Sequence, residues 1–171
     1  MNVTSHSRKT KISSSNVPVI LVVEDDPDNL LLLCHTLIFL KHNFITATTG
    51  KKAYNLVMEY EIDLMLLDLK LPDINGFELI SSLKEDKLTQ KIPIIVLSAL
   101  VRTQDRERAI KAGCNEYIIK PYLIEDLDSK IRRYLPGSFL NCKPMILKRS
   151  LMPSVSIDNS DDYIKAESGG K

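Results

Sequence analysis

Short apolar runs alternate with helical periodicity through the middle of this 171-residue chain. The runs are apolar at successive positions, as in strands that a parallel sheet buries on both faces. Because consecutive crossovers between parallel strands are right-handed, the repeated pattern predicts an α/β fold: a doubly wound parallel sheet with helices on both faces. The expected strands are 19–24, 44–47, 64–68, 94–98 and 116–119. The expected helices are 27–41, 49–60, a segment marked by Phe77 to Leu83, 102–112 and 123–135.

Acidic residues and a lysine stand where several of these strands end. Glu24 and Asp25 close the first strand, Asp68 closes the third, and Lys120 follows the last. The carboxyl ends of parallel strands meet at one edge of a sheet, where such folds bind ligands, so these side chains are expected to gather. Hard oxygen ligands without Cys or His favour Mg²⁺, and a nearby lysine indicates that an anion also binds. Helix capping would account for Asp26 alone.

Apolar residues concentrate in 18–135, which predicts one domain there and flexible tails over 1–17 and 136–171. The second tail is too short and too polar for a DNA-binding effector domain. The chain carries 23 basic and 22 acidic residues, with the acids in excess in the central region, so direct nucleic-acid binding is not expected. No run approaches the ~20 apolar residues of a membrane span, so no membrane association is expected. Three cysteines without regular spacing favour a reducing compartment, and a cytoplasmic location is the default expectation.

Four motifs, in order along the chain, together resemble the receiver domain of bacterial two-component response regulators. They are Val22-Val-Glu-Asp-Asp, Leu66-Leu-Asp-Leu-Lys-Leu-Pro-Asp-Ile-Asn-Gly, Ile94-Ile-Val-Leu-Ser-Ala and Ala112-Gly-Cys-Asn-Glu-Tyr-Ile-Ile-Lys-Pro. The resemblance covers about 19–135 and neither tail. It implies a flavodoxin-like fold with strand order 2-1-3-4-5 and, given the short second tail, a single-domain response regulator.

The resemblance also assigns roles at the strand ends. Asp68 would accept a phosphoryl group from a phosphohistidine, carried by a sensor histidine kinase or a histidine phosphotransfer protein. Glu24, Asp25, Asp68 and the backbone carbonyl of Lys70 would hold Mg²⁺, and Lys120 would pair with a phosphoryl oxygen. Glu24 stands where aspartate is commoner in the family, so it reaches farther and acts directly or through water.

A conformational switch is implied as well. Ser98 would donate its hydroxyl to the phosphoryl group, Tyr117 would turn inward behind it, and the changed surface would bind an unknown protein partner. The Lys120–Pro121 peptide bond is expected to be cis. We also hypothesise that Lys70 and Leu100 flank the path of attacking water and slow hydrolysis of the phosphorylated form.

Two other functions stay open. A metal-dependent phosphohydrolase could use Asp68 as a nucleophile, although Lys70 stands where a second catalytic acid would be needed. A receiver-like interaction module that phosphorylation does not control is the other alternative. In the leading interpretation the chain assists its own phosphorylation and dephosphorylation and is not a turnover enzyme. The segment 30–40 is more apolar than one buried stripe requires, which indicates either core packing or a docking face for a partner helix.

Overall fold

The structure, a computed structural model, describes residue 10 and residues 17–135. Strands and helices alternate strictly along this part of the chain, as the sequence predicted. The strands are β1 (Val19–Val23), β2 (Asn43–Ala47), β3 (Leu64–Leu67), β4 (Ile94–Ser98) and β5 (Glu116–Ile119). The helices are α1 (Pro27–Phe39), α2 (Gly50–Glu59), α3 (Gly76–Glu85), α4 (Thr103–Ala112) and α5 (Ile124–Tyr134).

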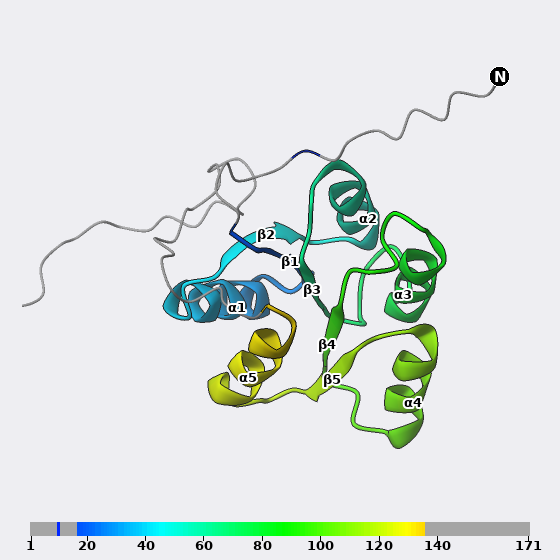
Figure 1. The fold of residues 1–171 in the computed structure, drawn as a ribbon. Helices are drawn as coiled ribbons and strands as arrows, with labels where there is room; N and C mark the ends of the chain where they lie inside the picture. The colour runs from blue at the N-terminus through cyan, green and yellow to red at the C-terminus, as the bar shows by residue number, and fades with distance from the viewer. Residues whose placement is uncertain (1–9, 11–16, 136–171) are drawn as a thin grey trace, which may run out of the picture.

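The described strands form one sheet in the order β2-β1-β3-β4-β5, with every neighbouring pair parallel. Helices α1 and α5 cover one face of the sheet, and α2, α3 and α4 cover the other (Figure 1). This arrangement confirms the predicted flavodoxin-like, doubly wound fold. The order reverses direction between β1 and β3, which places the expected ligand site at the carboxyl ends of those strands.

Strand β1 shows why the apolar runs lack a polar face. Leu21 and Val23 point into the cluster that α2, α3 and α4 cover, whereas Ile20 and Val22 point into the cluster beneath α1 and α5. All four side chains are buried. Because successive side chains point to opposite faces, a sheet with helices on both faces requires an apolar residue at every position.

Helix α1 begins as expected but ends earlier than the sequence indicated. The Asp26 side chain accepts hydrogen bonds from the backbone N–H groups of Asp28 and Asn29, at 3.1 and 2.9 Å, and so caps the helix. The helix stops at Phe39 rather than near Lys41, because Lys41 has a φ of 60°, in the left-handed region. The chain therefore turns there into β2.

The surplus apolar residues of α1 face solvent. Leu30, Leu33 and Leu37 pack in the core beneath α1, while Leu32 and Phe39 are 67% and 74% exposed. Of the two interpretations of segment 30–40, core packing explains only the inward residues.

The predicted tails, 1–17 and 136–171, lie almost wholly outside the described residues. At residue 10, Thr10 forms an isolated bridge with Tyr60.

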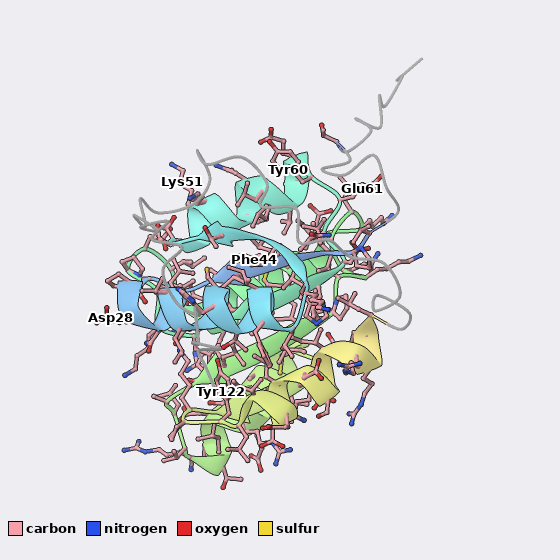
Figure 2. All side chains as sticks on the ribbon, turned by 90° about the vertical axis from the view of Figure 1, so that its left-hand side faces the viewer. Asp28, Phe44, Lys51, Tyr60, Glu61 and Tyr122 are labelled. Atoms are coloured by element: carbon pink, nitrogen blue, oxygen red, sulfur yellow. The ribbon has the colours of Figure 1, made fainter. Side chains whose placement is uncertain are left out.

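Backbone hydrogen bonds fix the strand ends at a common edge. The N–H of Glu24 donates to the carbonyl of Ala47 (3.1 Å), and the N–H of Asp68 donates to the carbonyl of Val23 (2.9 Å). In Figure 2, Asp28 and Lys51, at the starts of α1 and α2, lie toward one side of the molecule, and Tyr60, after α2, lies toward the other. The strands end on the side where these helices begin.

Candidate functional site

A lysine and two acidic side chains meet at the carboxyl edge of the sheet. The Nζ atom of Lys120, just after β5, lies 2.6 Å from Oε2 of Glu24 and 2.5 Å from Oδ2 of Asp68. The two carboxylates follow β1 and β3, the central strands, so the sheet brings together residues 96 and 52 positions away from the lysine. The structure thus gathers Glu24, Asp68 and Lys120, as strand-end geometry predicted.

Burial decides the electrostatics of this group. The side chains of Glu24 and Asp68 are 3% and 9% exposed, and that of Lys120 is 18% exposed. Burial raises the pKa of Glu24 above its ordinary value even though Lys120 pulls it down. Burial alone would lower the pKa of Lys120, but its hydrogen bonds and charge interactions with Asp68 and Glu24 raise it overall. Lys120 is therefore a firmly charged ammonium between two acids.

The second oxygen of Asp68 is held by its own loop. Oδ1 accepts a hydrogen bond of 2.7 Å from the backbone N–H of Lys70. The loop closes where the N–H of Gly76 donates to the carbonyl of Leu69 (3.1 Å), and a Cβ at residue 76 would lie only 2.6 Å from Cα of Leu69. Glycine permits this close approach. The carboxylate of Asp68 is consequently oriented on both of its oxygens.

Ser98 and Tyr117 converge on one residue. Ser98, at the end of β4, is fully buried, and its Oγ accepts a hydrogen bond from the N–H of Leu100 at 3.2 Å. The Oη of Tyr117 donates to the carbonyl of Leu100 at 2.8 Å. The loop after β4 therefore connects the strand-end hydroxyl to the aromatic side chain of β5. The peptide bond that follows Lys120, between Lys120 and Pro121, is cis.

Asp25 stands apart from the group. It is exposed, whereas its neighbour Glu24 is 2% exposed. Within residues 10 and 17–135, no three His, Cys, Asp or Glu side chains come close enough together to ligate a metal ion. The expected ligand set is thus not assembled: Lys120 lies between Glu24 and Asp68, and Asp25 points to solvent.

The residues still fit Mg²⁺ by their chemistry. All the expected side-chain donors are carboxylate oxygens, the ligands that a hard cation prefers. Glu24 and Asp68 are two buried carboxylates that share the single ammonium of Lys120, so negative groups outnumber positive ones in this contact. A divalent cation at this edge would supply the compensating charge. Glu24, Asp25, Asp68 and the carbonyl of Lys70 are the groups within this edge that could hold it.

Two features of the site escaped the sequence analysis. The sequence placed Glu24 and Lys120 at one edge of the sheet but did not indicate that the two would pair directly, at 2.6 Å. Asp73, in the loop after β3, accepts hydrogen bonds from the N–H groups of Gly50 and Lys51, both at 2.8 Å. No local pattern links residues so far apart in the chain, although the missing acid in the first turn of α2 was a weak signal.

Comparison with known proteins gives a consistent result. The model of the response regulator receiver domain matches residues 20–132. The chain is 32% identical over 116 residues to the polar-differentiation response regulator DivK of Brucella ovis, covering 68% of this chain and 94% of DivK. It is also 30% identical over 148 residues to a probable cyclic di-GMP phosphodiesterase of Vibrio cholerae. That match covers 86% of this chain but only 30% of the relative.

A further curated relative is also much longer than the matching segment. The DNA-binding dual master transcriptional regulator RpaA of Synechocystis is 32% identical over 119 residues, which cover 70% of this chain and 49% of RpaA. The chain thus spans half or less of two of these three relatives.

Solved structures share the fold. The receiver domain of a sensor histidine kinase from Pseudomonas aeruginosa PAO1, described with a magnesium ion coordinated in its active-site cleft, superposes with a TM-score of 0.65 at 28% identity. The superposition covers 70% of this chain and 98% of that domain. A CheY-like receiver domain protein from Methanospirillum hungatei gives a TM-score of 0.64, also at 28% identity, over 70% of this chain and 94% of that protein.

Proposed function

This chain belongs to the response regulator receiver domain family, and from that premise we propose that Asp68 is its phosphoryl acceptor. The observation that carries the proposal is the buried group in which Lys120 contacts both Glu24 and Asp68 at the carboxyl edge of the sheet. The family's signalling role and this arrangement together favour a switch that phosphorylation operates. Its donor would be a phosphohistidine on a sensor kinase or a phosphotransfer protein.

The transfer exchanges one bond for another. The carboxylate of Asp68 attacks phosphorus, an O–P bond forms, and the N–P bond of the phosphohistidine breaks with its electron pair left on the imidazole nitrogen. The hydrogen bond from the N–H of Lys70 to Oδ1 and the ion pair of Oδ2 with Lys120 hold the carboxylate in one orientation. After transfer, the ammonium of Lys120 pairs with the phosphoryl oxygens instead.

The attacking carboxylate and the phosphoryl group are both negatively charged, so their approach needs compensating charge. Mg²⁺, when bound, would supply that charge. We assign Glu24, Asp25, Asp68 and the backbone carbonyl of Lys70 to hold it. Asp25 is exposed and can turn toward the edge without disturbing the core.

The signal would leave through the surface around β5. The Ser98 hydroxyl, at the end of β4, would donate to a phosphoryl oxygen, and its oxygen already accepts a hydrogen bond from the N–H of Leu100. A move of Ser98 would therefore disturb Leu100, whose carbonyl anchors Tyr117. Exposed apolar side chains lie on the surrounding elements, among them Ile119 at 43% and Leu123 at 67% exposure. We propose that a protein partner reads the change there.

The surroundings of Asp68 disfavour a phosphohydrolase. The side chain two residues after Asp68 is the exposed Lys70, so no second carboxylate occupies the place of a general acid or base. Receiver domains such as DivK serve as signalling modules, and we propose that this chain catalyses only its own phosphorylation and dephosphorylation.

None of the helices within residues 17–135 combines the length and the apolar character that a bilayer-spanning helix requires.

Incubation with acetyl phosphate and Mg²⁺, followed by intact-mass measurement, tests the proposal. We expect one phosphoryl adduct on the wild type and none on Asp68→Asn. Asp86→Asn serves as the matched control, because Asp86 lies beyond the end of α3 and should leave the adduct intact. Steady phosphate release without an adduct would support the hydrolase, and the absence of both would support an interaction module.

A further inference from the structure

The loop between β3 and α3 is tied to the start of a different helix. Asp73 lies in this loop, and its Oδ1 accepts a hydrogen bond from the N–H of Gly50 while its Oδ2 accepts one from the N–H of Lys51, both at 2.8 Å. These are the first two residues of α2. One carboxylate therefore joins the loop that follows Asp68 to the N-terminus of α2.

The contact completes the cap of α2. The first N–H groups of a helix have no partner within the helix and carry partial positive charge. Thr49 caps the helix locally by accepting a hydrogen bond from Lys52, and α2 has no acidic residue in its own first turn. Asp73 supplies the missing acid from outside. The two amide hydrogen bonds, that of Lys51 first, hold the pKa of Asp73 below its ordinary value.

Packing at the same point is unusually close. A Cβ on Gly50 would lie 2.1 Å from Cγ2 of Ile74 and 3.5 Å from Oδ1 of Asp73. Only glycine lets the helix start come this near to the loop. Beyond this contact a hollow of about 490 Å³ opens between α2 and α3, with Tyr54 and Ser82 in its walls. Leu71 and Ile74 hold the loop by apolar packing against the core, and Asp73 adds its hydrogen-bonded attachment to α2.

The loop carries the groups that orient the phosphoryl acceptor. The N–H of Lys70 holds Oδ1 of Asp68, and the carbonyl of Lys70 is the proposed backbone ligand for Mg²⁺. The base of the loop is fastened where Gly76 bonds to Leu69, and the link of Asp73 fastens its outer part. Movement of the outer part would displace Lys70 between these two points.

We infer that Asp73 is a positioning residue: by binding the N-terminus of α2, it holds the β3–α3 loop so that Lys70 presents its N–H to Asp68 and its carbonyl to the metal site. The inference rests on the proposed function for its metal site. Mutation of a residue that orients a metal ligand without binding the metal itself typically weakens metal affinity by about 10- to 100-fold. Because Asp73 is exposed, we expect the low end of this range, roughly tenfold, when Asp73 is replaced.

Asp73→Asn and Asp73→Ala test this inference against Asp86→Asn. Asn retains one acceptor oxygen for two N–H groups, and Ala retains none. The control removes the same charge from a carboxylate that also accepts a backbone hydrogen bond, from Leu88 at 2.8 Å. Titration with Mg²⁺, followed by amide chemical shifts, gives the dissociation constant. Hydrogen exchange of residues 69–75 measures the loop directly, without phosphorylation.

We expect weaker Mg²⁺ binding and faster loop exchange in Asp73→Asn, a larger effect in Asp73→Ala, and wild-type values in Asp86→Asn. Wild-type Mg²⁺ affinity and loop exchange in both Asp73 variants would overturn the inference, as would a wild type that binds no Mg²⁺. A wild type that binds Mg²⁺ but forms no adduct with acetyl phosphate would refute the proposed function alone. The Mg²⁺ affinity and the loop exchange rate would still test the role of Asp73, because neither measurement requires phosphorylation.

Discussion

Replacing Lys120 with methionine should destabilise the folded protein, because it leaves two buried carboxylates without their shared cation. Glu24 and Asp68 have side chains only 3% and 9% exposed, and Lys120 contacts each within 2.6 Å. Removing one partner of a buried ion pair costs roughly 3–5 kcal/mol, and the partial exposure of Lys120 reduces our expectation to about 2–4 kcal/mol. With a urea m-value of about 2 kcal/mol/M, the unfolding midpoint should fall by about 1–2 M.

The assay is urea unfolding at pH 7, followed by circular dichroism in EDTA, with Lys130→Met as the matched control. Lys130 pairs with Glu116 at 2.8 Å, but Glu116 also pairs with Arg133, so the control leaves no acid without a partner. Its cost should stay below ~1 kcal/mol, as for other surface pairs. If Lys120→Met unfolds at the same urea concentration as the wild type, the electrostatic argument for this site is wrong.

Two further measurements separate charge from packing. Glu24→Gln in the Lys120→Met background removes one of the two unpaired charges, so the double variant should recover part of the lost stability. Saturating Mg²⁺ should stabilise Lys120→Met more than the wild type, because the cation then replaces the missing ammonium. Loss of stability that neither change restores would point to lost packing of the lysine stem instead.

Two other predictions concern pH and the lifetime of the signal. His42 is buried, and burial lowers its pKa, with Asp128 raising and Arg132 lowering it in smaller measure. As the pH falls below about 6.5, His42 is protonated in the unfolded chain but stays neutral in the folded protein, so the free energy of unfolding should decrease toward pH 5. Urea unfolding at several pH values should show a smaller decrease in His42→Gln. Lys70→Ala and Leu100→Ala should each release phosphate faster from the phosphorylated protein, and a change under roughly threefold, about 0.7 kcal/mol in the barrier, would count against the shielding hypothesis.

The sequence was sufficient to predict the fold because each strand and each helix start has its own local residue pattern. Strand β1 is an example, because helices cover both faces of the sheet. Leu21 and Val23 pack on one face and Ile20 and Val22 on the other, so the strand must be apolar throughout. Caps such as Asp26 mark helix starts with equal clarity. The end of α1 was misjudged because apolar periodicity continues through Leu40, and only the left-handed backbone at Lys41 shows where the chain turns.

The candidate site was determined in part by the same logic. Parallel strands bring their carboxyl ends to one edge, so the sequence alone placed Glu24, Asp68 and Lys120 together. It could not decide how they would pair. Whether an ammonium lies between two carboxylates, or the carboxylates face outward toward a metal, depends on side-chain reach and burial that arise only when the strands assemble.

Tertiary structure alone decided the support around that site. Asp73 reads in the sequence as one residue of a turn, yet it completes the cap of a helix that begins 23 positions earlier. Leu100 reads as an apolar loop residue, yet its backbone joins Ser98 to Tyr117. Hydrogen bonds between distant segments leave no period or motif in the chain, because their partners are chosen by the packing of whole elements.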